Sequence, residues 1–436
     1  MEKLLDIARK VSDKVEIYSI EQTVDSISFE NAKLKDINSK LQSGTSIRII
    51  KDEKLGFAFT KNIIDEEELV SNALVSLKGG VDAKFNLPFT NDLPRLYTYD
   101  PSIENLTTTT IIDECNRIAG IFAAKTDGQV NIHAGRMIEK ISLMNSNGLD
   151  LSVKSSYYYC SPAIMYPGSY ASISRVMTTK KFSQTPGEHL DFILGTYNKS
   201  LQEAIPGSGR MKVLFLPETM YVLLWRLQSA ASGKSIYENQ SPIADKLGEK
   251  LFSGNLTIYN DPLNDQFPGA RTFDDEGTPG RYFPVVEDGV LKNFYYDLHY
   301  AGKLNVQPTG HGFRSAMWGG EAISTKPIPS LAHLYIKPGD KSFSDLIRSI
   351  DKGVIVANAL GAHSGNIPNG DFSIGLSPGL YVENGEIVGY VKDAMVAGNI
   401  YETMKNLIAI EDTLYPAMMG TYPALLFDDV SVTTKA

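Results

Sequence analysis

A polar segment, residues 271–281, contains the three consecutive carboxylates Asp274, Asp275 and Glu276, with an arginine at each end. Such a cluster could hold a hard metal ion, or supply a general acid and a general base. The same residues are also typical of a solvated turn whose carboxylates accept hydrogen bonds from backbone N–H groups and pair with Arg271 or Arg281. From these residues alone we favour the structural turn.

A second polar loop, residues 308–314, combines the imidazole of His311 and the guanidinium of Arg314 with glycines at positions 310 and 312. These groups suit the binding of an anion or of a peptide backbone, although a structural loop is the simpler interpretation. If His311 met the three carboxylates in one pocket, the chain would carry the groups of a hydrolase. That alternative stays open at this point.

Several common catalytic and cofactor motifs are absent from the sequence. No histidine is followed by another three to five residues later, so the HExxH pair of many zinc proteases is missing. Neither Cys115 nor Cys160 has a partner at zinc-ligand spacing, and Cys115 falls on the apolar face of a predicted helix, which indicates a core thiol. Glycine-rich phosphate loops are also missing.

Composition and charge narrow the class of protein. Apolar residues make up 42% and charged residues 21% of the chain, as in ordinary globular proteins, and the formal net charge is −9. An acidic chain without a Lys/Arg cluster binds nucleic acid and anionic lipid poorly, since both need a cationic surface. No apolar run approaches the roughly 18 residues of a membrane span, and the charged N-terminal helix is unlike a signal peptide. We therefore expect a cytoplasmic protein with no membrane or nucleic-acid partner.

The 436 residues exceed the roughly 250–300 at which a single core stops growing, so we expect two domains, 1–205 and 206–436. The hydrophobic periodicity predicts an α+β fold, with helices on a mixed or antiparallel sheet in the first domain and a β-rich second domain. Helices are predicted near residues 4–15, 65–77, 111–122, 186–205, 220–231 (capped by Gly233), 344–351 and 400–410. Strands are predicted at residues 24–30, 46–50, 56–60, 211–216 and 424–432, with a meander across 130–177 and hairpins at 286–291 and 382–387.

At the polar loops the sequence resembles a known family, TldD/PmbA. The likeness is strongest across residues 211–320, and weaker likeness at 46–48, 145–148 and 382–385 extends it over the whole chain. Its motifs are the segments 245–250 (DKLGEK), 273–279 (FDDEGTP), 286–291 (VEDGVL) and 308–310 (PTG).

The resemblance implies a cytoplasmic, metal-dependent peptidase system built from two related subunit types. The TldD type carries a HExxxH helix and a later cysteine that bind zinc, and the TldE/PmbA type lacks them. Members of the family have also been linked to modulation of DNA gyrase, a link that no residue of this acidic chain supports.

This sequence departs from the TldD pattern where the zinc should bind. By alignment, Trp225 stands at the first histidine, Arg226 at the glutamate and Ala230 at the second histidine, and no cysteine follows Cys160. Tryptophan and alanine offer zinc no lone pair, and arginine is a permanent cation that cannot act as a general base. The resemblance therefore places the chain with the TldE/PmbA type, with no metal or other cofactor of its own.

We accordingly expect the non-catalytic subunit of a heteromeric TldD/PmbA zinc metallopeptidase. A TldD-type partner would supply the zinc, and this chain would help to hold an unfolded peptide substrate near it. The residues expected to form or brace the wall of the peptide groove are Asp274, Asp275, Glu276, Arg281, His311 and Arg314.

Two other functions remain compatible with the sequence. The chain could be a stand-alone, homodimeric peptide-binding protein that cuts nothing. It could also be a hydrolase that uses Asp274, Asp275 and Glu276 together with His311, provided that these groups converge in one pocket.

The missing ligands generate a first prediction. The purified chain should retain no stoichiometric zinc, because Trp225 and Ala230 cannot ligate it and the C-terminal cysteine is absent. Elemental analysis of protein freed of its purification tag checks this, and about one tightly bound zinc per chain would contradict it.

Overall fold

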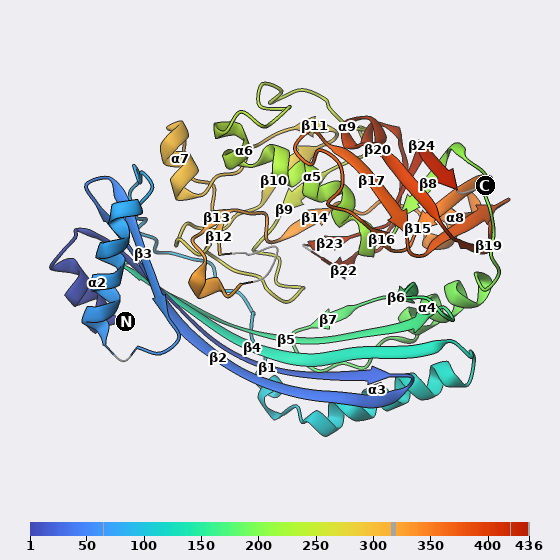
Figure 1. The fold of residues 1–436 in the computed structure, drawn as a ribbon, viewed down its shortest axis with the longest axis horizontal. Helices are drawn as coiled ribbons and strands as arrows, with labels where there is room; N and C mark the ends of the chain where they lie inside the picture. The colour runs from blue at the N-terminus through green and yellow to red at the C-terminus, as the bar shows by residue number, and fades with distance from the viewer. Residues whose placement is uncertain (64, 315–319, 419, 435–436) are drawn as a thin grey trace.

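The computed structural model describes residues 1–63, 65–314, 320–418 and 420–434. It confirms the α+β prediction, because the chain forms two large β-sheets, smaller sheets and short helices. One long, curved sheet lies below the rest of the molecule, and the C-terminal half packs on its concave side (Figure 1). No helix among the described residues combines the length and the hydropathy needed to cross a bilayer.

The curved sheet has seven strands and is antiparallel throughout. The predicted meander across residues 130–177 is confirmed, but the first two strands are much longer than predicted. The added part of the second strand, residues 33–43, is polar and mostly exposed, so it has no hydrophobic alternation to reveal it. The strand order is β3 (Lys54–Thr60), β2 (Lys33–Lys51), β1 (Lys14–Glu30), β4 (Gln129–Asn145), β5 (Asp150–Met165) and β6 (Ser172–Ser174), with β7 (Met177–Thr179) also paired to β5.

Four helices belong to this half of the chain: α1 (Glu2–Arg9), α2 (Glu66–Ser76), α3 (Thr108–Ala123) and α4 (Gly187–Lys199). The first is shorter than predicted, because Val15 enters strand β1 instead and is fully buried there. Asp65 caps α2 by accepting the backbone N–H groups of Glu67 and Glu68. Helix α3 covers the convex face of the sheet (Figure 1), and Cys115 is a free, buried thiol packed in that core.

The C-terminal half contains a nine-stranded and a six-stranded mixed sheet and one isolated strand pair. The final strand of the chain lies inside the nine-stranded sheet and pairs with three others, β20, β8 and β21. The nine strands are β16 (Ala359–Leu360), β17 (Asp371–Leu376), β20 (Ala394–Asn399), β24 (Leu425–Thr434), β8 (Gly209–Phe215), β15 (Lys352–Val356), β18 (Gly379–Glu383) and β19 (Glu386–Val391), with β21 (Leu407–Ile410) beside β24. The other strands are β11 (Val290–Leu291), β10 (Phe283–Glu287), β9 (Ile258–Asn260), β14 (Leu334–Ile336), β23 (Gly420–Tyr422) and β22 (Tyr415–Ala417) in the six-stranded sheet, and the pair β12 (Gly312–Phe313) and β13 (Ile328–Pro329).

Two helix predictions in this half need correction. Gly233 does not cap a helix end but opens a further short helix, which follows directly after a bend at Ser232. The predicted helix 400–410 ends after Thr403 and is followed by a short 3₁₀ turn. Its apolar end, Leu407–Ile410, forms strand β21. The prediction was wrong there because a short apolar run fits the periodicity of a helix as well as that of a strand. The helices are α5 (Tyr221–Ala231), α6 (Gly233–Tyr237), α7 (Leu298–Leu304), α8 (Phe343–Arg348) and α9 (Ile400–Thr403).

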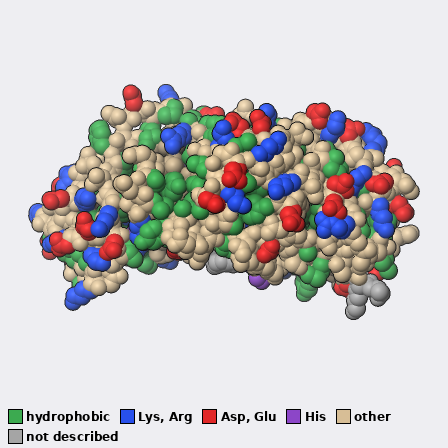
Figure 2. Space-filling model, turned by 90° about the horizontal axis from the view of Figure 1, so that it is seen from above, with side chains coloured by type: hydrophobic (Ala, Val, Ile, Leu, Met, Phe, Trp, Pro, Cys, Tyr) green, Lys and Arg blue, Asp and Glu red, His purple; other side chains and the backbone are tan. Residues whose placement is uncertain are grey.

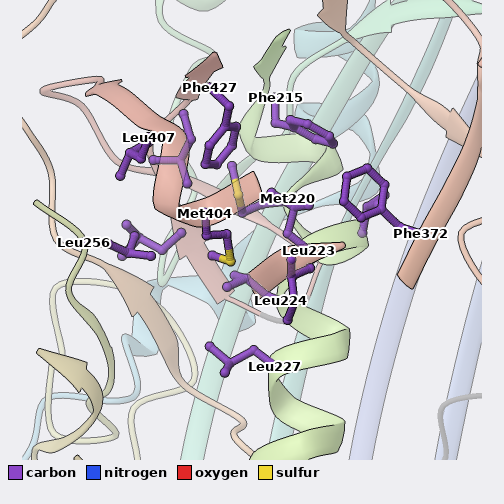
Figure 3. Close-up of a cluster of buried hydrophobic side chains, with 14 of the residues drawn as sticks. Phe215, Met220, Leu223, Leu224, Leu227, Leu256, Phe372, Met404, Leu407 and Phe427 are labelled. Carbon is purple, nitrogen blue, oxygen red and sulfur yellow. The ribbon is translucent and has the colours of Figure 1, made fainter. Parts of the chain in front are cut away.

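Helix α5 crosses the largest hydrophobic cluster of the described chain and is apolar on nearly every side. Figure 3 shows Leu224 and Leu227 of this helix pointing toward Leu256 and Met404. A helix that is buried all round has little freedom to shift, so α5 is a rigid support for whatever lies beside it.

A second hydrophobic cluster joins the two halves of the chain. It includes Ile27 and Ile132 of the curved sheet together with Leu214 and Ile355 of the nine-stranded sheet. The strands of the curved sheet precede residue 206 and those of the other sheets follow it. The predicted domain boundary at 205/206 therefore separates the curved sheet from the other sheets, but it cuts through a hydrophobic core that both halves share. The two-domain division remains a proposal.

Four buried charges also connect the halves, and we call them the buried joint: Glu16 and Arg48 on the curved sheet, and Glu276 and Arg314 on loops of the C-terminal half. Arg48 holds both oxygens of Glu16 through its Nε and Nη2, with Nε 2.8 Å from Oε1, and its Nη1 lies 2.8 Å from Glu276 Oε1. Arg314 Nη2 donates to the same Glu16 over 2.9 Å. The four side chains are at most 3% exposed.

The buried joint generates a stability prediction. We expect Arg48→Met to lower the free energy of unfolding by about 3–5 kcal/mol, because two buried carboxylates would share one cation fewer. Arg210→Met is the matched control, since the Arg210–Asp429 pair is 58% exposed on each side and should contribute about 1 kcal/mol or less. Urea unfolding measures both values, and equal small losses would contradict the role of the joint.

Candidate functional site

A cavity of about 720 Å³ lies beside helix α5. On the helix side it is lined by Trp225, Gln228 and Ser229, and on the opposite side by residues 328–332. Because α5 is fixed in the hydrophobic core, the helix side of this cavity is preformed.

The three positions of the missing zinc motif have separate roles in the structure. Trp225 lines the cavity, whereas Ala230 is completely buried in the core. Arg226 points away and is fully buried, donating to the carbonyls of Val222, Ala362, Ser364 and Asp371.

These side chains do not fit a zinc ion. Burial lowers the pKa of Arg226 to about 10, which still leaves the guanidinium charged at neutral pH. An indole, a guanidinium and a methyl group offer the metal no ligand. Among the described residues, no group of three or more His, Cys, Asp or Glu side chains is arranged to hold a metal ion.

Gln228 is a polar group at this cavity that the sequence analysis did not single out. The residue is 5% exposed, and its side-chain Nε2 finds no hydrogen-bond acceptor in the described part of the chain. Its backbone carbonyl accepts from the hydroxyl of Tyr295, another cavity residue, over 2.7 Å. An amide donor without an acceptor is costly in a core and useful in a binding site, where a carbonyl can approach it.

The acidic segment folds as the hydrogen-bonded turn that we favoured, but the turn is buried and not solvated as we expected. Asp274 accepts backbone N–H groups from Glu276, Thr278 and Gly312 over 2.8–3.0 Å. Burial raises the pKa of Asp274, and the neighbouring Glu276 raises it further. This carboxyl therefore holds the turn together and has no open side for a substrate.

The next two carboxylates connect the turn to its surroundings. Asp275 accepts the backbone N–H of Arg314 over 2.7 Å and pairs with Arg271 over 2.8 Å. Glu276 accepts the backbone N–H of Leu298, at the start of α7, over 2.7 Å and binds Arg48 in the buried joint. Asp275 is 4% exposed and Glu276 is fully buried.

His311 lies in the same buried region, and Arg281 does not. The Nδ1 of His311 is 2.8 Å from the hydroxyl of Thr309, and its ring packs 4.6 Å from that of Phe283. Burial, aided by the charges of Arg281 and His333, lowers the pKa of His311 to about 3, so its imidazole is neutral at neutral pH. Arg281 is exposed.

The structure thus brings together five of the six expected groove residues as a buried support between the two halves. None of the six lines the cavity beside α5, and their contact with a peptide stays a prediction. The sequence analysis missed Glu16 and did not assign Arg48 a role. The available signal was Arg48 itself, a charge within the apolar run of residues 47–50, which requires a buried counter-charge.

Comparisons with known proteins agree with this architecture. The PmbA/TldA metallopeptidase C-terminal domain matches residues 208–434, and domain 1 of the same family matches residues 15–76. The crystal structure of TldE from Thermococcus kodakarensis superposes with a TM-score of 0.90 at 22% identity, covering 99% of both chains, which shows the shared fold. A proposed modulator of DNA gyrase from Thermotoga maritima has a TM-score of 0.85 at 25% identity, covering 99% of this chain and 100% of that one.

Two relatives match at the level of sequence over nearly their full length. A protein from Methanothermobacter thermautotrophicus named as a metalloprotease is 28% identical over 421 residues, which are 92% of this chain and 89% of the relative. An uncharacterized protein of Methanocaldococcus jannaschii is 27% identical over 423 residues, 94% of this chain and 95% of the relative. With the two domain matches covering more than half of its length, the chain belongs to the PmbA/TldD metallopeptidase family.

Proposed function

We propose that this chain is the non-catalytic subunit of a heteromeric TldD/PmbA zinc metallopeptidase. The observation that supports the proposal is the cavity beside α5, which is present although the aligned positions of the zinc motif hold Trp225, Arg226 and Ala230. A family member with neither zinc ligands nor a binding space would have no visible role in proteolysis. This chain lacks the ligands and has a space in which a peptide can bind.

The cavity suits an extended, unfolded peptide. Its apolar wall can take a side chain, and Gln228 Nε2, which is buried without an acceptor, becomes a donor to a backbone carbonyl when the wall beside it moves. Recognition through the backbone does not depend on the peptide's sequence, which fits a subunit that presents varied unfolded substrates. In this proposal a TldD-type partner supplies the zinc and the cutting residues, and the complex works in the cytoplasm.

The charge of the surface fits a protein partner better than nucleic acid. On the face shown in Figure 2, acidic and basic side chains are interspersed, with apolar side chains between them. The net charge of −9 adds no attraction for phosphate.

The proposal is tested by reconstitution. We expect no cleavage of unstructured peptides by this chain alone, and cleavage when a HExxxH-bearing relative from the same organism is added. Installing His at positions 225 and 230 and Glu at 226 should not give activity to the lone chain, because the cysteine ligand and the groups that orient the ligands would still be missing. Peptide cleavage, followed by mass spectrometry, is the measurement.

Gln228→Leu should raise the KM of the reconstituted complex several-fold, because a peptide carbonyl would lose its donor. The exposed Gln202→Leu is the matched control and should leave cleavage unchanged. Chelator-sensitive cleavage by the lone chain would overturn the subunit assignment. Tight peptide binding without any copurifying HExxxH partner would instead support a stand-alone peptide-binding protein.

A further inference from the structure

A second cavity, of about 390 Å³, lies between the curved sheet and the C-terminal half. Glu139 and Tyr157 line it on the sheet side, and Arg271 and His333 line it on the other. Ala332 lines both this cavity and the cavity beside α5, so the two cavities lie close together.

Arg271 is bonded on only one of its sides. Its side chain is 11% exposed, and its Nη1 pairs with Asp275 over 2.8 Å. Its Nε and Nη2 are buried and find no hydrogen-bond partner among the described residues. A buried guanidinium with two unused N–H groups is costly unless something else accepts them.

The unused pair of nitrogens is the edge of a guanidinium that grips a carboxylate with two parallel hydrogen bonds. The described residues show this use three times. Arg48 holds Glu16, Arg117 holds Glu114 and Arg210 holds Asp429, in each case through Nε and Nη2. In Arg271 this edge has no carboxylate.

Two further groups shape the site. His333 has a buried Nε2 without a partner among the described residues, and burial lowers its pKa to about 3, so its neutral ring can add a hydrogen bond without a second charge. Glu139 accepts from Gln22 over 3.0 Å, and burial raises its pKa. Because Asp275 already pairs with Nη1, a monoanion at Nε and Nη2 would complete the hydrogen bonding of the Arg271 guanidinium.

We propose that this second cavity binds a carboxylate, namely the C-terminal carboxylate of a peptide whose preceding residues occupy the cavity beside α5. The inference rests on the proposed function, since it assumes that a peptide binds there. A cavity of this size suits the end of a chain better than a chain that must continue beyond it. Because the two nitrogens are covered in the structure, a side chain of the cavity wall rotates when the carboxylate enters.

The test measures fluorescence anisotropy of a short, labelled, unstructured peptide titrated with the full chain. The peptide is used as the free acid and as the C-terminal amide. Wild-type protein should bind the acid about tenfold more tightly than the amide, because only the acid completes two charge-assisted bonds. Arg271→Met should abolish this preference, and the exposed Arg210→Met should retain it. Circular dichroism checks that each variant is folded.

If Arg271→Met fails to fold because Asp275 is left unpaired, His333→Phe is the second variant, and it should reduce the preference. Equal binding of acid and amide by wild-type protein would overturn the carboxylate site and leave the proposed function standing. No binding of either peptide would overturn both. An amidated peptide ending in Glu that binds as tightly as the free acid would support the carboxylate site and assign it to an acidic side chain.

Discussion

The arrangement of the two halves depends on the buried joint. Removing four charged groups from water costs several kcal/mol each, and only complete mutual pairing offsets that cost. Two arginines and two glutamates meet this condition only when the concave face of the curved sheet lies against the loops that carry Glu276 and Arg314. Apolar contacts tolerate some sliding of one surface on another, but the hydrogen-bonded charges of the buried joint do not. The joint therefore sets the position of one half on the other.

Buried charged residues also fix the walls of both cavities. Glu276 binds Arg48 and the start of α7, while the adjoining Asp275 orients Arg271 at the wall of the second cavity. Arg226, at the position where the family's catalytic glutamate would stand, instead binds four carbonyl groups and fixes the segment 362–371 against α5. The charged residues of this chain thus stabilise the walls of the binding space.

Hydrophobic patterns predicted those helices and strands whose buried residues form one long apolar segment of the sequence. Helix α5 and the strand before it were found within two residues, since long apolar segments leave little ambiguity. Short apolar runs were less informative, as Leu407–Ile410 shows, and the exposed half of β2 carried no pattern. The acidic turn was predicted, because Asp274 accepts two of its hydrogen bonds from residues within four positions, but its burial and its bond to Gly312 were not. The partners of Arg48 were not predicted, since Glu276 lies more than two hundred residues away in the sequence.

The position of the last strand also affects the synthesis of the protein. Strand β24 lies inside the nine-stranded sheet, between β20 and β8, yet both of these strands are synthesised before it. Until β24 has emerged from the ribosome, β8 exposes an unpaired edge and the apolar side chains of Phe215 and its neighbours lack part of their cover. The nine-stranded sheet therefore cannot close when β8 is made, and a nascent chain carries an exposed, aggregation-prone edge until β24 is available.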